Sequence, residues 1–157
     1  MAAENDTIAQ IATASGAGGV GIVRISGPQA RLIGRAAVGL ASADERRMVF
    51  VHVRDASGEI IDEGLYVELV GPRSMTGEDV AELQVHGGRV GLQRVLGRCL
   101  ELGARAAEPG EFLRRAFEHG KIDLARAEAM AQAVAAETEA AHRIAQQQLA
   151  GALSRRI

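Results

Sequence analysis

A carboxylate, an amide and an imidazole alternate in the segment DVAELQVH, residues 79–86. Successive side chains of a β-strand point to opposite faces, so Glu82, Gln84 and His86 would share one face while the residues between them face an apolar core. Arg24 stands in a second apolar segment, VGIVRIS. Two interpretations follow. Either the outer faces are solvated and Arg24 and Glu82 form an ordinary ion pair, or the sheet holds a polar ligand whose donors meet the carboxylate.

Lys121 is the only lysine, beside seventeen arginines. A lysine in so arginine-biased a chain suggests a need for a compact ammonium group, which the planar guanidinium cannot imitate. The alternative is an accidental surface lysine.

The glycines at 16–21 match G-x-G-x-x-G letter for letter. A dinucleotide-binding loop needs a helix directly after the motif, because the free N–H groups of the helix bind the pyrophosphate. The residues that follow are β-branched and alternate, which predicts a strand. We therefore expect a flexible connection between two strands and no pyrophosphate site.

Other catalytic and metal-binding patterns are missing. The sequence has no G-x-x-x-x-G-K-[ST] phosphate loop, no G-x-S-x-G, and four histidines without metal-ligand spacing. Cys99 falls within a helical pattern, which predicts a buried structural thiol. The segment TGED (76–79) is interpreted as a structured loop, since a strand pattern follows it. We assign no catalytic residue and no metal site.

The pattern of apolar residues predicts an α/β (α+β) fold. Strands are expected at 7–13, 20–26, 48–55, 59–70 and 80–86. Helices are expected at 27–40, with Pro28 in the first turn, at 87–103, with a stop at Gly103, and between Pro109 and Gly120. An Ala-rich segment capped by Asp123 predicts one long helix to the end of the chain. Its thin apolar stripe requires a packing partner, so the sequence looks cut from something longer or built to pair with another chain.

Length and composition set further bounds. The 157 residues suffice for one domain plus an appended element. The net charge of −2 gives no electrostatic case for nucleic-acid binding by this surface alone, and a single cysteine excludes an internal disulfide. The polar N-terminus and the lack of a long apolar run predict a soluble, cytoplasmic protein without membrane contact.

Four segments together resemble the N-terminal region of the MnmE (TrmE) family of bacterial tRNA modification GTPases. They are NDTIAQIAT…GAGGVGIVRISGP, TGEDVAELQVHGG, EPGEFLRRAFEHGKIDLARAEA and ETEAA…LAGALSRRI, and they cover nearly the whole chain in family order. The resemblance implies a tetrahydrofolate-binding domain similar to that of the glycine-cleavage T-protein. Residues 1–120 would bind folate and dimerise, and residues 121–157 would begin the family's central helical domain. The family's G domain and C-terminal C-x-G-K motif have no counterpart here.

By the same resemblance, Arg24, Glu82 and Lys121 would contact 5-formyltetrahydrofolate or another reduced folate, the one-carbon donor for C5 of the wobble uridine. The full-length family protein also uses GTP, magnesium and potassium, none of them bound by this region. Its partners are a second copy, the FAD-containing MnmG and tRNA. Whether this region alone is an enzyme stays open, because the GTPase elements are missing. The alternative function is a purely structural dimerisation module with a vestigial folate site.

Two departures from the family pattern bear on the folate site. The family usually has TPPG where this chain has TASG (13–16), and an aromatic residue where it has Met75. If that aromatic stacks on the ligand, Met75 supplies a softer contact and the affinity would be lower.

Overall fold

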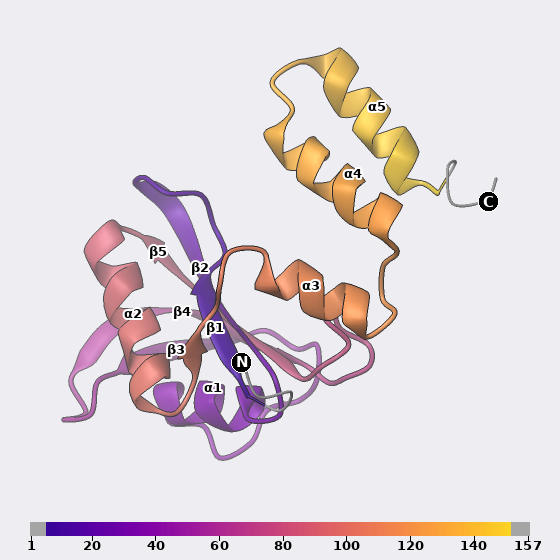
Figure 1. Cartoon of the computed structure of the whole chain (residues 1–157). Helices are drawn as coiled ribbons and strands as arrows, with labels where there is room; N and C mark the ends of the chain where they lie inside the picture. The colour runs from indigo at the N-terminus through magenta and orange to yellow at the C-terminus, as the bar shows by residue number, and fades with distance from the viewer. Residues whose placement is uncertain (1–5, 152–157) are drawn as a thin grey trace. The chain divides into compact units, whose positions relative to one another are not determined.

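The chain forms two compact units, Met1–Pro109 and Gly110–Ile157, in a computed structural model that describes residues 6–151 (Figure 1). The last of the four family segments, ETEAA…LAGALSRRI, therefore ends outside the described residues. The unit boundary falls before the third helix, whereas the resemblance places the domain boundary after Gly120. Within residues 6–151, no helix is long and apolar enough to cross a membrane.

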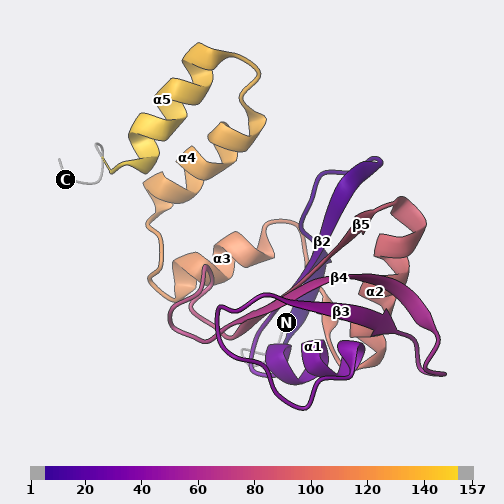
Figure 2. The same ribbon diagram turned by 180° about the vertical axis from the view of Figure 1, so that it is seen from behind.

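The first unit is built on a six-stranded sheet in the order β3-β4-β5-β2-β1-β6. Figures 1 and 2 show this sheet from opposite sides. The strands are β1 (Ile8–Ile11), β2 (Gly18–Ser26), β3 (Val49–Arg54), β4 (Ile60–Leu69), β5 (Val80–Gly87) and β6 (Arg105–Ala106). All neighbours are antiparallel except β1 and β6, which run parallel. β6 was not predicted, because two residues are too few for a periodic pattern.

Helices α1 (Ala30–Val38) and α2 (Arg89–Glu101) pack on one face of this sheet. The ladder aligns Val23 with Leu83 and Tyr66 with Leu83, so alternate positions of neighbouring strands share this face. The apolar side chains on this face of the sheet and on the buried sides of both helices form one core. Gly34 lets α1 approach the sheet, because a Cβ there would lie 2.6 Å from the Tyr66 hydroxyl.

The start of α1 differs from the expectation. The helix begins at Ala30 with Gln29 as its N-cap, so Pro28 precedes the helix instead of standing in its first turn. The glycine motif also differs in part. Gly18 and Gly21 already belong to β2, with an irregular register between them, and only the earlier glycine of the motif lies in the connection from β1. A strand follows the motif, as predicted.

The second unit holds α3 (Glu111–Glu118), α4 (Leu124–Ala135) and α5 (Glu139–Leu149). The prediction of one long helix from Asp123 is wrong, because the chain is extended at Ala136 and Thr138. The Thr138 side chain accepts a hydrogen bond from the Ala141 N–H (3.1 Å) and starts α5 as its N-cap. The predicted cap of α4 is confirmed, since Asp123 Oδ1 accepts from the Arg126 N–H at 2.7 Å.

Candidate functional site

The structure brings together two of the three predicted ligand residues. Arg24 on β2 and Glu82 on β5 are direct cross-strand partners. Arg24 Nε donates to Glu82 Oε2 at 2.7 Å, and the two side chains keep 22% and 15% of their surface exposed. They lie on the sheet face opposite the one that α1 and α2 cover. The ion pair of the first interpretation is therefore present, in a position that solvent can reach.

Amide side chains flank this ion pair. Gln10 on β1 is the cross-strand partner of Arg24, and Val67 on β4 is the partner of Glu82. Two residues further along β5, Gln84 Nε2 lies 3.5 Å from Glu82 Oε1. A cation, a carboxylate and two amides thus stand in adjacent positions on one face. Such a set can both donate to a ligand and accept from it.

An apolar row runs across the same face beside the polar one. Gln84 pairs with Ile22 on one side and Leu65 on the other, and Leu65 pairs with Phe50 on the edge strand β3. Leu65 and Phe50 are 39% and 63% exposed. An exposed apolar row beside polar groups is typical of a surface that contacts a ligand or another protein.

His86, at the end of the predicted polar row, has a partner that the sequence did not indicate. Its Nδ1 lies 2.7 Å from Asp62 Oδ1 of β4. The hydrogen bond to Asp62 and the charge of that carboxylate raise the pKa of His86 above its ordinary value. His86 is thus engaged away from Glu82, and the alternation on β5 alone could not show this.

The TGED segment forms a structured loop, as predicted, and the loop is joined to the end of β2. Ser26 Oγ lies 2.7 Å from Thr76 Oγ1, and it donates to Glu78 Oε1 at 3.0 Å. The Gly71 N–H donates to Asp79 Oδ1 at 2.9 Å. Thr76 is fully buried. The loop is therefore held next to the strand that carries Arg24, and it presents the partly exposed Met75.

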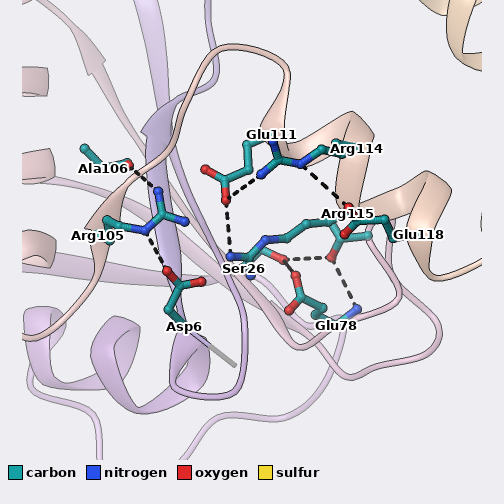
Figure 3. A network of polar contacts seen from close by, with 10 residues as sticks. Asp6, Ser26, Glu78, Arg105, Ala106, Glu111, Arg114, Arg115 and Glu118 are labelled. Carbon is teal, nitrogen blue, oxygen red and sulfur yellow. Dashed lines mark hydrogen bonds and ion pairs between the residues drawn. The ribbon is translucent and has the colours of Figure 1, made fainter. Parts of the chain in front are cut away.

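Lys121, the third predicted ligand residue, follows α3 in the second unit. Its backbone N–H donates to the Ala116 carbonyl at 2.8 Å and so closes the end of that helix. Charged residues line α3, where Arg114 and Arg115 both reach Glu111 within 3.5 Å (Figure 3). The lysine thus stands at a fixed turn directly after a charged helix.

The end of the first unit carries its own ion pair. Arg105 Nε donates to Asp6 Oδ2 at 2.6 Å and its Nη1 to the Ala106 carbonyl at 3.1 Å (Figure 3). The pair joins the start of β1 to β6, the two parallel strands. It therefore secures the sheet edge next to the strand that carries Gln10.

The other candidate groups do not contribute to this site. Cys99 has no exposed surface, and burial raises the pKa of its thiol to about 12, so it is the structural thiol that its pattern predicted. Within residues 6–151, no three His, Cys, Asp or Glu side chains are grouped so as to hold a metal ion. The TASG segment (13–16) lines a cavity of about 270 Å³ with the start of α2.

Comparison with known proteins places the chain among relatives of one kind. A family model described as "GTP-binding protein TrmE N-terminus" matches residues 7–121. The chain is 50% identical over its full length to "tRNA modification GTPase MnmE" of Xanthomonas campestris pv. campestris, covering 35% of that protein. A protein of the same description from Aromatoleum aromaticum is 54% identical, over 95% of this chain and 33% of the relative. Another from Pseudomonas paraeruginosa is 52% identical, over 100% of this chain and 34% of the relative. The chain thus spans about a third of the length of these relatives.

Proposed function

The chain belongs to the GTP-binding protein TrmE N-terminus family, and from this premise we propose that it is the folate-binding and homodimerising part of a tRNA modification GTPase. In this proposal it holds a reduced folate, of which 5-formyltetrahydrofolate is the probe of choice, as the one-carbon donor for a wobble uridine in tRNA. In this proposal the full-length protein hydrolyses GTP with magnesium and potassium. That protein acts in the cytoplasm together with the FAD-containing MnmG.

One observation carries the folate proposal, namely the Arg24–Glu82 pair on the sheet face opposite α1 and α2, where both side chains stay partly exposed. A pterin ring has an exocyclic amine and a ring N–H on one edge, and a carboxylate can accept both hydrogen bonds. A carboxylate has about four acceptor positions, so Glu82 retains capacity for a ligand while Arg24 holds one of its oxygens. Arg24 and Lys121 supply the cations for the carbonyl and glutamate oxygens of the folate.

Calorimetric titration of the chain with 5-formyltetrahydrofolate tests this proposal. Glu82→Gln keeps the shape of the side chain but replaces an acceptor oxygen with a donor, so it should abolish saturable binding. Lys121→Ala should weaken binding by removing a charge. The matched control is Glu101→Gln, which alters an exposed carboxylate on α2 that pairs only locally with Arg98. No binding by the parent would refute the folate proposal. Binding that survives Glu82→Gln would place the ligand elsewhere.

A second candidate function, a structural dimerisation module with a vestigial site, is favoured by the same face. Phe50 and Leu65 are exposed side by side, and the Arg24–Glu82 pair already satisfies its own charges. Light scattering after gel filtration separates the two candidates when combined with the titration. A dimer that binds no folate would support the structural module. A monomer, with or without folate, would remove dimerisation from the proposal.

A further inference from the structure

The Glu82 carboxylate is held asymmetrically. Its Oε2 atom accepts the short bond from Arg24 Nε at 2.7 Å. Its Oε1 atom has one contact within residues 6–151, a long one of 3.5 Å from Gln84 Nε2. A hydrogen bond at this distance is weak, so Oε1 is the oxygen with spare acceptor capacity. A ligand that approaches Oε1 therefore meets the amide of Gln84 beside it.

The orientation of the Gln84 amide is set by its neighbour. With the NH2 group toward Oε1, one N–H faces the carboxylate and the second is free to donate elsewhere. The opposite orientation would bring the amide oxygen against the Glu82 carboxylate, and two acceptors would repel each other. Gln84 is therefore held as a donor beside the accepting Oε1 atom.

The spacing of the two side chains suits one edge of a heterocycle. Residues two apart on a strand share a face and lie roughly 7 Å apart along it, and here their polar tips have converged. The amine, ring N–H and carbonyl of a 2-amino-4-oxo pteridine follow one another as donor, donor and acceptor. Glu82 accepts from the two donors, and the free N–H of Gln84 faces the carbonyl.

Apolar side chains flank Gln84 on both neighbouring strands. Its direct cross-strand partners are Ile22 on β2 and Leu65 on β4. Leu65 is partly exposed and can contact the face of a planar ring. A hydrogen bond formed among apolar neighbours is also less exposed to competition from water.

From this geometry we infer that Gln84 contributes to the ligand selectivity of the site by donating to the 4-oxo group of the pteridine, an inference that rests on the proposed folate function. A 4-amino pteridine presents a donor at the same position, and its N3 carries no hydrogen, so it also loses one of the two donors that Glu82 accepts. The 4-amino group would oppose the N–H of Gln84, and Glu82 prevents the amide from turning to accept it. The site therefore favours 2-amino-4-oxo over 2,4-diamino pteridines.

The test compares 5-formyltetrahydrofolate with its 4-amino-4-deoxy analogue on the whole chain. The parent should prefer the 4-oxo ligand by roughly tenfold or more, since a site built to bond a polar group discriminates strongly against its mismatch. Gln84→Met keeps the length of the side chain without the amide and should lower the ratio of the two dissociation constants several-fold, leaving the preference that Glu82 sets through the ring N–H. Gln84→Glu replaces the donor with an acceptor and should shift the ratio further toward the 4-amino analogue than Gln84→Met does.

Gln147→Met is the matched control, because Gln147 is an exposed amide on α5. It should leave the ratio at the parent value. The ratio distinguishes selectivity from a general loss of affinity or of folded protein, which would weaken both ligands together. A parent that binds both ligands equally, or a Gln84→Met variant that keeps the parent ratio, would overturn the inference and leave the folate proposal in place. A parent that binds neither ligand would overturn both.

Discussion

Arg35 Nε lies 2.6 Å from Glu68 Oε1, and the carboxylate of this ion pair has no exposed surface. Glu68 sits on β4 and Arg35 on α1, so the pair joins the helix to the sheet. Arg31 of the same helix donates to the other oxygen at 2.9 Å, and the Tyr66 hydroxyl donates to Oε1 at 2.8 Å. The buried charge of Glu68 is tolerated because both of its carboxylate oxygens accept hydrogen bonds.

Replacing this carboxylate should destabilise the fold. Glu68→Gln keeps the volume but leaves two arginines without their counter-charge, and breaking a buried pair from one side costs about 3 kcal/mol. Urea unfolding followed by circular dichroism measures the loss. Glu101→Gln is the control, since its exposed pair with Arg98 contributes under about 1 kcal/mol. Equal midpoints for the two variants would mean that the buried cluster adds nothing to stability.

The same cluster should make stability depend on acid. Burial alone would raise the pKa of Glu68, but the hydrogen bonds from Arg35, Arg31 and Tyr66 together outweigh it and hold the pKa below its ordinary value. A lowered folded-state pKa gives a contribution that is fully present above the unfolded pKa of about 4.3. It is lost as the pH falls through the folded value. The difference in unfolding free energy between the parent and Glu68→Gln should be constant near neutral pH and shrink below about pH 4. A difference that does not change with acid would contradict this assignment.

The His86–Asp62 pair shifts a pKa in the opposite direction to the Glu68 cluster. The hydrogen bond that His86 Nδ1–H donates to Asp62, followed by the charge of that carboxylate, raises the pKa of His86. The stabilising effect of the pair is present below the ordinary histidine pKa of about 6.5 and is lost as the pH rises through the folded value. In an NMR titration, Asp62→Asn should lower the His86 pKa. Asp44→Asn, which alters a distant exposed carboxylate paired with Arg47, should leave it unchanged. A His86 pKa that does not respond to Asp62→Asn would show that the two groups are not in contact in solution.

Cys99 should be inert in the folded protein. Its thiol is buried in α2, and desolvation raises its pKa to about 12, so almost no thiolate forms at neutral pH. An aromatic disulfide reagent at pH 8 should label the chain only after urea unfolding, at a rate set by the unfolded fraction. Rapid labelling in native buffer would show that α2 opens locally.

The sequence indicated the Arg24–Glu82 pair, as one of two interpretations, because Arg24 is a lone charge in an apolar strand and such a charge needs a partner. It did not indicate that Glu68 would be buried, although this residue lies in a strand just as well predicted. The difference is tertiary. Burial of Glu68 depends on Arg31 and Arg35 arriving from a helix more than thirty residues away along the chain, and no local pattern records that match.

The break between α4 and α5 was missed for a local reason. Alanine-rich segments on both sides favour helix, and this preference extends across residues 136–138. Thr138 competes by bonding the backbone of its own next turn, an interaction that ends one helix and begins another. Helix propensity summed over a window does not resolve such competition at one residue.

The cap at Thr138 gives a final prediction with a built-in control. Thr138→Ala removes the acceptor for the Ala141 N–H, so this amide should exchange with deuterium faster and stability should fall by about 1 kcal/mol. Asp123→Ala removes the acceptor for the Arg126 N–H in the same way at the start of α4. Each substitution should expose its own amide and leave the other protected, because the two caps lie at the starts of separate helices. Slower exchange at Ala141 in Thr138→Ala, with a gain in helical circular dichroism, would instead show that alanine propensity can join α4 and α5 once the competing side chain is gone.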